Sequence, residues 1–233
     1  MTSGPPGPHG RQRPADFRSY RRRVGAALEA LRDARGEKVY EQAVPSYTHS
    51  NPLMAWVFWQ RLRVVMCCLE RIEIGTVLDF GCGSGVLLPF LADSATSVLA
   101  ADVVSEPAEF LLRHLGQRAI PVITSPGFLG TLADRSLDTI VALDVLEHVE
   151  DLDGTIREFA RVLSARGRVV VSGPTESAAY RMGRRLAGFT THSHLRNVFQ
   201  IEAAFARAFR IRRISVLRYP LPFFRIFTAE RVS

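Results

Sequence analysis

The chain of 233 residues has little cysteine and almost no lysine, and it lacks any long apolar run. Its three cysteines, two of them adjacent at Cys67 and Cys68, form neither a disulfide framework nor a zinc-ligand pattern, so a reducing, cytoplasmic setting is expected. No stretch approaches the roughly 18 apolar residues of a membrane span, and the first residues contain no apolar core of a secretion signal. Hydrophobic residues make up 47% of the chain, which is typical of a globular protein.

The basic residues are nearly all arginines, since Lys38 is the only lysine, and the formal net charge is +7. Two groups of arginines lie near the chain ends: Arg18, Arg21, Arg22 and Arg23, and then Arg207, Arg210, Arg212 and Arg213. Such groups attract nucleic acid or anionic membranes, or they form a solvated face. The aromatic residues among them recur at spacings of three and four, which suits the core face of a helix better than a base-stacking platform. We therefore expect no nucleic-acid partner.

The chain divides into three regions. Residues 1–15 are rich in glycine, proline and arginine and are predicted to be a disordered tail. Residues 16–71 carry two helical patterns and are interpreted as an N-terminal helical lid. From residue 72 to 233 short apolar runs alternate with helices, which predicts an α/β fold with a parallel sheet covered on both faces. Residues 174–208 are interpreted as an insertion outside the common core.

The expected strands are Thr76–Phe80, Ser97–Ala101, Ala119–Ile123, Thr139–Leu143 and Arg168–Ser172, followed by a pair at about 211–217 and 224–230. The expected helices are 17–35, 53–72, Val86–Ala92, Pro107–Leu115, Leu152–Leu163 and Ile201–Phe209.

Three glycines occupy every second position in "VLDFGCGSG" (77–85), directly after the first expected strand. Each glycine costs backbone entropy on folding and offers no side chain for packing. Three of them in five residues therefore indicate a special turn, a close ligand, or both. A doubly wound sheet places cofactors at the ends of its strands, where such a turn opens the first helix. About twenty residues later the second expected strand ends in Asp102, whose carboxylate can accept both hydroxyls of a ribose or can cap a loop. We favour ribose binding.

The loop reads D-x-G-x-G-x-G from Asp79, and Val86 stands where a dinucleotide fingerprint needs its last glycine. At this point the sequence resembles the class I S-adenosylmethionine-dependent methyltransferases. The resemblance continues through "SLDTIVALDVLEHVEDL" (136–152) and "ARGRVVVSGPTE" (165–176), which are similar to the branch of the ubiquinone and menaquinone biosynthesis enzymes. It implies a Rossmann-like, mostly parallel seven-stranded sheet with an antiparallel last strand. It also implies S-adenosyl-L-methionine as the cofactor.

The resemblance assigns cofactor roles along the chain. The loop from Gly81 through Cys82 and Gly83 to Gly85 would pass under the methionine end, and Asp79 would shape it or reach the amino group through water. Asp102 would hold the ribose, and Val103 would pack on adenine. The family often has an acid that accepts from the adenine amino group, but Phe128 stands there. Stacking and backbone hydrogen bonds from Phe128 and Leu129 are therefore expected. Asp144 and Val145 would line the wall near the reacting methyl.

The sequence defines the acceptor of the methyl group less closely than it defines the cofactor. Methyltransferases of nucleobase amines carry an Asn/Asp-Pro-Pro-aromatic motif after the fourth strand, whereas this chain has Asp144-Val-Leu-Glu147. We expect a small-molecule or amphipathic acceptor: a secondary metabolite, quinone, lipid or sugar. An RNA methyltransferase and an inactive cofactor-binding partner protein are the alternatives. No metal site is expected.

Two sets of residues are candidates for work on the acceptor. His192 and His194 are candidate general bases, because imidazole titrates near pH ~6.5, or they are exposed loop histidines. Tyr47, His49 and Arg61 are candidate substrate-binding residues that could close over the site, or they serve core packing and solvation.

Overall fold

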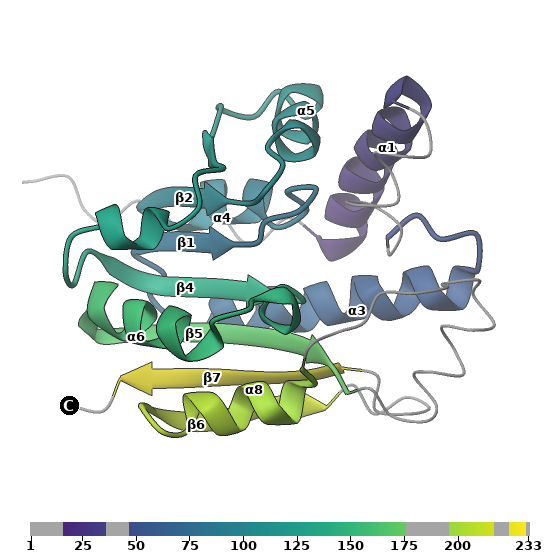
Figure 1. Ribbon diagram of the computed structural model, residues 1–233. Coiled ribbons are helices and arrows are strands. Elements are labelled where there is room, and N and C mark those ends of the chain that lie inside the picture. Colours follow the sequence, from purple (N-terminus) through teal and green to yellow (C-terminus); the bar gives the residue numbers. More distant parts are fainter. Residues whose placement is uncertain (1–15, 36–46, 176–195, 217–223, 232–233) are drawn as a thin grey trace, which may run out of the picture.

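The computed structural model of the protein describes residues 16–35, 47–175, 196–216 and 224–231. Within these residues, seven strands form one sheet in the order β3-β2-β1-β4-β5-β7-β6 (Figure 1). The strands are β1 (Thr76–Phe80), β2 (Ser97–Ala101), β3 (Val122–Ile123), β4 (Leu137–Leu143), β5 (Leu163–Pro174), β6 (Phe209–Val216) and β7 (Phe224–Arg231). The α-helices are α1 (Phe17–Arg35), α3 (Pro52–Leu69), α4 (Leu88–Ser94), α5 (Glu106–His114), α6 (Leu152–Val162) and α8 (Val198–Phe205). Two 3₁₀ turns are η1 (Phe128–Thr131) and η2 (Leu146–His148).

The sheet is parallel from β3 to β5, and β7 runs antiparallel to both β5 and β6. The predicted fold class, a Rossmann-like mostly parallel sheet with an antiparallel last strand, is confirmed. The strand β3 is shorter than expected. It pairs only with Ala100 and Ala101 of β2, and Pro121 directly before it has no N–H group to donate to a ladder.

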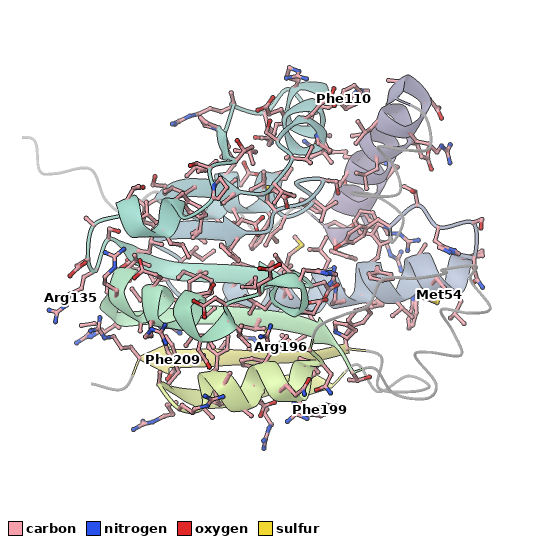
Figure 2. The ribbon with its side chains drawn as sticks, viewed as in Figure 1. Met54, Phe110, Arg135, Arg196, Phe199 and Phe209 are labelled. Atoms are coloured by element: carbon pink, nitrogen blue, oxygen red, sulfur yellow. The ribbon has the colours of Figure 1, made fainter. Side chains whose placement is uncertain are left out.

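Alternate residues of the central strands enter two different cores, because successive side chains of a strand point to opposite faces. Val77, Val141 and Val170 pack with α1, α3, α4 and α5 on one face. Leu78 and Ile140 pack with α6 and α8 on the other. Figure 1 shows α6 and α8 on the near side of the sheet, with α3 and α4 behind it. Within the described residues, exposed large apolar side chains are few; Phe199 lies on the outer side of α8, 48% exposed (Figure 2).

The N-terminal helices are packed onto the sheet. Helix α3 begins at Pro52, where the Asn51 side chain accepts a hydrogen bond from the Leu53 amide and caps the helix. Tyr20 of α1 donates its hydroxyl to the Val86 carbonyl, 2.5 Å away, at the end of the glycine loop. The predicted lid therefore shares one core with the sheet and contacts the loop directly. The predicted tail, residues 1–15, lies outside the described residues.

No helix among the described residues combines the length and the apolar character that a membrane crossing requires.

Candidate functional site

A cavity of about 450 Å³ opens where β1, β2 and β4 end at their carboxyl edge. This volume falls in the range of small-molecule and cofactor sites, which is about 300–1,000 Å³. The residues that line it are Phe80, Gly81, Ala101, Asp102, Val103, Ile123, Thr124, Ser125, Pro126, Gly127, Phe128, Asp144, Val145, His148 and Val149. The cavity thus brings together six of the residues predicted to hold a cofactor: Gly81, Asp102, Val103, Phe128, Asp144 and Val145.

The three glycines of the loop after β1 all have positive φ angles, +74° at Gly81, +55° at Gly83 and +75° at Gly85. A Cβ atom at Gly81 would overlap the side chain of Val145, which follows β4. One at Gly85 would come within 3.0 Å of Ala108 in α5. At Gly83 an added Cβ would meet nothing within 4 Å. Two of the glycines are therefore required by the packing of the protein itself, and the third leaves an open side next to the backbone.

Asp102 ties the glycine loop to the end of β2. Its Oδ2 accepts a hydrogen bond from the Gly83 amide at 2.7 Å, and its Oδ1 accepts one from the Val104 amide at 3.3 Å. The loop is also held through the Ala101 carbonyl, which accepts from the amides of Gly81 (2.8 Å) and Cys82 (3.0 Å). Beside Asp102 the Val103 side chain is 89% exposed. A carboxylate and an apolar side chain therefore lie next to each other on the cavity wall.

Two predicted cofactor residues have buried side chains at the loop: Asp79 in β1 before it, and Cys82 within it. Asp79 is buried, and its Oδ2 has no hydrogen-bond partner among the described residues. Burial, with a smaller contribution from the negative charge of Asp102, raises the pKa of Asp79 to about 7. The Cys82 side chain is buried in the apolar core, and burial followed by the charge of Asp79 raises the pKa of its thiol. Cys82 therefore contributes its backbone amide to the loop, with its thiol neutral.

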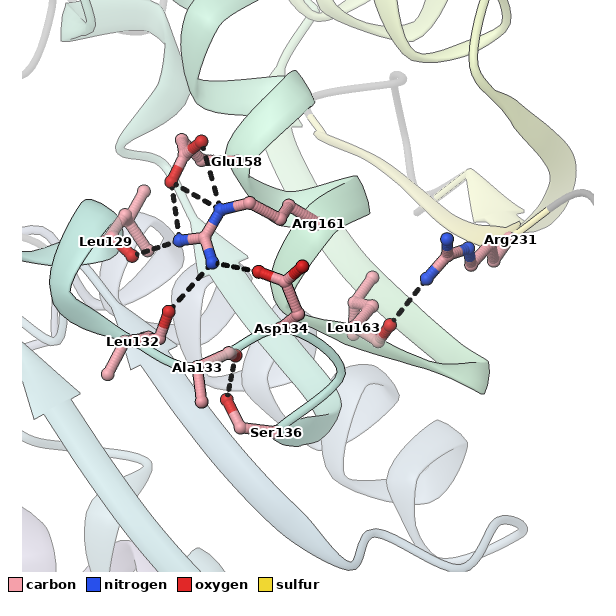
Figure 3. A network of polar contacts seen from close by, with 9 residues as sticks. All are labelled: Leu129, Leu132, Ala133, Asp134, Ser136, Glu158, Arg161, Leu163 and Arg231. Atoms are coloured by element: carbon pink, nitrogen blue, oxygen red, sulfur yellow. Dashed lines mark hydrogen bonds and ion pairs between the residues drawn. The ribbon is translucent and has the colours of Figure 1, made fainter.

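The far wall is formed by η1, where the ring of Phe128 stacks on Phe80 with centroids 6.2 Å apart, and Leu129 is buried. Arg161 of α6 holds this wall in place (Figure 3). Its guanidinium donates to the carbonyls of Leu129 (2.7 Å) and Leu132 (2.8 Å). Two acids, Asp134 and Glu158, pair with the same guanidinium at 2.6 and 2.7 Å.

Arg161 was not anticipated from the sequence. The i,i+3 pair with Glu158 is visible there, but it predicts only a surface ion pair on a helix.

A second arginine missed from the sequence supports the opposite wall. Arg196, just before α8, donates to the carbonyls of Val149 (2.6 Å) and Glu150 (2.9 Å), directly after η2 (Figure 2). Val149 lines the cavity, so this contact fixes the turn that follows β4.

The predicted substrate-binding residues lie behind the cavity wall. Arg61 and Tyr47 are buried, and Arg61 donates to the Tyr47 hydroxyl at 2.7 Å. Arg61 also forms an ion pair with Asp144. His49 is partly exposed, and its Nδ1 accepts a hydrogen bond from the Asn51 amide at 2.9 Å, at the start of α3. His192 and His194 lie outside the described residues. Among those that are described, no group of three or more His, Cys, Asp or Glu could hold a metal ion.

Comparisons with known proteins show the family to which the chain belongs. A family model described as a methyltransferase domain matches residues 16–210. The ubiquinone biosynthesis O-methyltransferase of Alkalilimnicola ehrlichii is 29% identical over 115 residues, 48% of this chain and 47% of that protein. The chain therefore spans about half the length of the curated relatives it matches.

Solved structures share the fold. The magnesium protoporphyrin IX methyltransferase from Synechocystis PCC 6803, with bound S-adenosyl-L-homocysteine, is 22% identical with a TM-score of 0.57, covering 91% of this chain and 100% of that one. The N-methyltransferase NodS from Bradyrhizobium japonicum WM9 is 15% identical with a TM-score of 0.58, covering 93% and 98%. With the family model covering most of its length, the chain belongs to the methyltransferase domain family, in the class I branch whose cofactor is S-adenosyl-L-methionine.

Proposed function

We propose that this protein transfers the methyl group of S-adenosyl-L-methionine to an oxygen, carbon or nitrogen atom of a small-molecule or amphipathic acceptor. The observation that carries the proposal is the cavity wall formed by Asp102 and the exposed Val103, where Asp102 also accepts from the amide of Gly83, a loop glycine whose added Cβ would meet no atom within 4 Å. A carboxylate suits ribose hydroxyls, an apolar side chain suits a purine face, and an unobstructed backbone allows close approach of a ligand.

In this proposal, each wall of the cavity holds one part of the cofactor. Asp102 accepts from the ribose, and its hydrogen bond with the Gly83 amide keeps the carboxylate fixed before the ligand arrives. Val103 and Phe128 enclose the adenine, and Leu129 holds its edge. The loop from Gly81 to Gly85 carries the methionine end, with Asp79 beneath it.

When bound, the cofactor supplies a methyl group already activated by its positive sulfur, so the protein must mainly orient the acceptor and exclude water. Val145 and the stacked rings of Phe80 and Phe128 are apolar groups suited to that exclusion.

The turn Asp144-Val145-Leu146-Glu147 supports the choice of acceptor class, because it lacks the prolines and aromatic residue of nucleobase amine methyltransferases. The names of the curated relatives point the same way, toward oxygen atoms of quinone precursors. His192 and His194 stay predicted general bases for a hydroxyl acceptor. One of the two His→Ala changes should then lower turnover by about 10²–10⁴ and leave cofactor affinity unchanged.

The test is to incubate the purified protein with methyl-labelled S-adenosyl-L-methionine and, in parallel reactions, with a fraction of small molecules, of lipids or of RNA as the acceptor. The proposal expects label in the small-molecule or lipid fraction, and much less of it from the Asp102→Ala variant when the cofactor is limiting. Label confined to RNA would overturn the acceptor class. Cofactor binding without label in any fraction would favour the inactive partner protein.

A further inference from the structure

Arg61 is a buried charge among the apolar residues on the buried face of α3. It is 4% exposed, and its neighbours Trp59 and Leu62 on the helix are also buried. Removing a guanidinium from water costs several kcal/mol unless a partner and hydrogen bonds compensate it. The helix would pack as well with an apolar residue here, so the reason for an arginine lies in what it contacts.

The contacts of Arg61 connect α3 to the cavity. One guanidinium nitrogen pairs with Oδ2 of Asp144, and another donates to the Tyr47 hydroxyl. Three aromatic rings surround the group, with centroids 5.1 Å (Phe224), 5.3 Å (Phe58) and 5.9 Å (Tyr47) from Cζ. Such rings favour a cation over a neutral group at this place. Arg61 itself does not line the cavity, but its partner does.

Asp144 is the member of this buried pair that lines the cavity. It lies directly after β4, has a positive φ angle of +53°, and its side chain is 23% exposed. Apart from Arg61, its contact among the described side chains is a long hydrogen bond of 3.5 Å from Ser172 Oγ to Oδ1. Strand β1 lies between β2 and β4, so Asp102 and Asp144 lie on opposite sides of the glycine loop. Under the proposed function, a cofactor whose ribose is held at Asp102 and whose methionine end lies along the glycine loop would bring its sulfur toward Asp144.

We propose that Arg61 is a positioning residue that holds and neutralises Asp144, and that the pair sets the preference of the cavity between the cofactor with its cationic sulfur and the product S-adenosyl-L-homocysteine, whose sulfur is uncharged. Arg61 then acts through Asp144, in place of the direct acceptor contact predicted from the sequence. The two ligands differ in one methyl group and one positive charge, so their affinity ratio reports the charge near the sulfur. The inference uses the cofactor alone and does not depend on which acceptor the protein takes.

The test is to measure by calorimetry the affinities for S-adenosyl-L-methionine and S-adenosyl-L-homocysteine in the wild type and in four variants. Asp144→Asn leaves the Arg61 charge unbalanced and should lower the ratio of cofactor to product affinity by about three- to tenfold, the effect of one charge at partly screened distance. Arg61→Met leaves the Asp144 charge unbalanced and should raise the ratio by a similar factor. The double variant Arg61→Met/Asp144→Asn should return it to the wild-type value.

The fourth variant is the control. Arg63→Met removes an exposed arginine from the same helix and should leave the ratio unchanged. If Arg61→Met does not fold, Asp144→Asn, the double variant and Arg61→Lys, which keeps the charge and should keep the ratio, still decide the question. The proposal is overturned if Asp144→Asn binds both ligands in the wild-type ratio, or if the two single changes shift the ratio in the same direction. A loss of thermal stability with an unchanged ratio would assign the pair a structural role only.

Discussion

At the scale of single residues, substitutions of the glycines in the loop after β1 should have two different effects. One lowers the stability of the protein, and the other weakens cofactor binding. Gly81→Ala forces a methyl group into Val145 and should destabilise the protein by about 1–3 kcal/mol for overpacking, in addition to about 1–2 kcal/mol for the left-handed conformation at φ +74°. Gly83→Ala meets no protein atom and should cost only the left-handed conformation, about 1–2 kcal/mol. If the cofactor approaches this open side of the loop as proposed, the added methyl should weaken cofactor binding by about tenfold or more.

Urea unfolding and calorimetry of the two glycine variants separate these effects. A Gly83→Ala protein that binds S-adenosyl-L-homocysteine like the wild type would mean that the ligand does not approach this part of the loop.

Asp79 makes stability depend on pH. Because its pKa is raised from an ordinary value of 3.8 to about 7, the folded protein binds a proton there that the unfolded chain has lost. The free energy of unfolding should therefore fall as pH rises from about 4 to about 7, by at most about 1.4 kcal/mol per pH unit. Asp79→Asn should remove this part of the slope. Urea titrations of wild type and variant at several pH values in this window check it, and parallel slopes would contradict the burial of an unpaired carboxyl.

At the scale of elements, Arg161 joins α6 to the wall formed by η1. Arg161→Ala removes the hydrogen bonds to the carbonyls of Leu129 and Leu132 and should speed amide hydrogen exchange in residues 127–134. Cofactor affinity should fall by about three- to tenfold, because this segment carries Phe128. Arg157→Ala, an exposed change on the same helix, is the control. Exchange that is equally slow in both variants would show that η1 is held by its own packing.

The helices and strands also show which features of the fold and site could be predicted from the sequence. Strands β1 and β2 end where the apolar runs end, and Gly83 of the glycine loop meets Asp102 as their spacing predicts. Local periodicity is enough for this, since a buried parallel strand is a continuous apolar run. Arg61 could be interpreted as a solvated arginine, and nothing local in the sequence pairs it with Asp144, 83 positions away. Contacts of that kind depend on how helices dock on a sheet, which periodicity does not encode.

At the scale of the whole molecule, the net charge of +7 could favour nucleic acid, but the second arginine group is partly neutralised. Arg213 pairs with the buried Glu202 at 2.8 Å, and Arg207 pairs with Asp153 at 3.5 Å. We therefore expect only weak RNA binding, lost as salt rises to physiological strength, and turnover within a few-fold of normal after deletion of residues 1–15. Filter binding at several salt concentrations tests this. Tight RNA binding at physiological salt that the deletion abolishes would contradict it.

The central claim is that the cavity at the carboxyl edge of β1, β2 and β4 holds the cofactor, with Asp102 on the ribose. Calorimetric titration of S-adenosyl-L-homocysteine into the wild type and into Asp102→Ala tests it most directly. The account predicts one site per chain in the wild type and a loss of about 1.5–3 kcal/mol of binding free energy in the variant, the usual contribution of hydrogen bonds to a charged group. Circular dichroism checks that the variant is folded. A folded Asp102→Ala protein that binds with wild-type affinity would place the cofactor elsewhere.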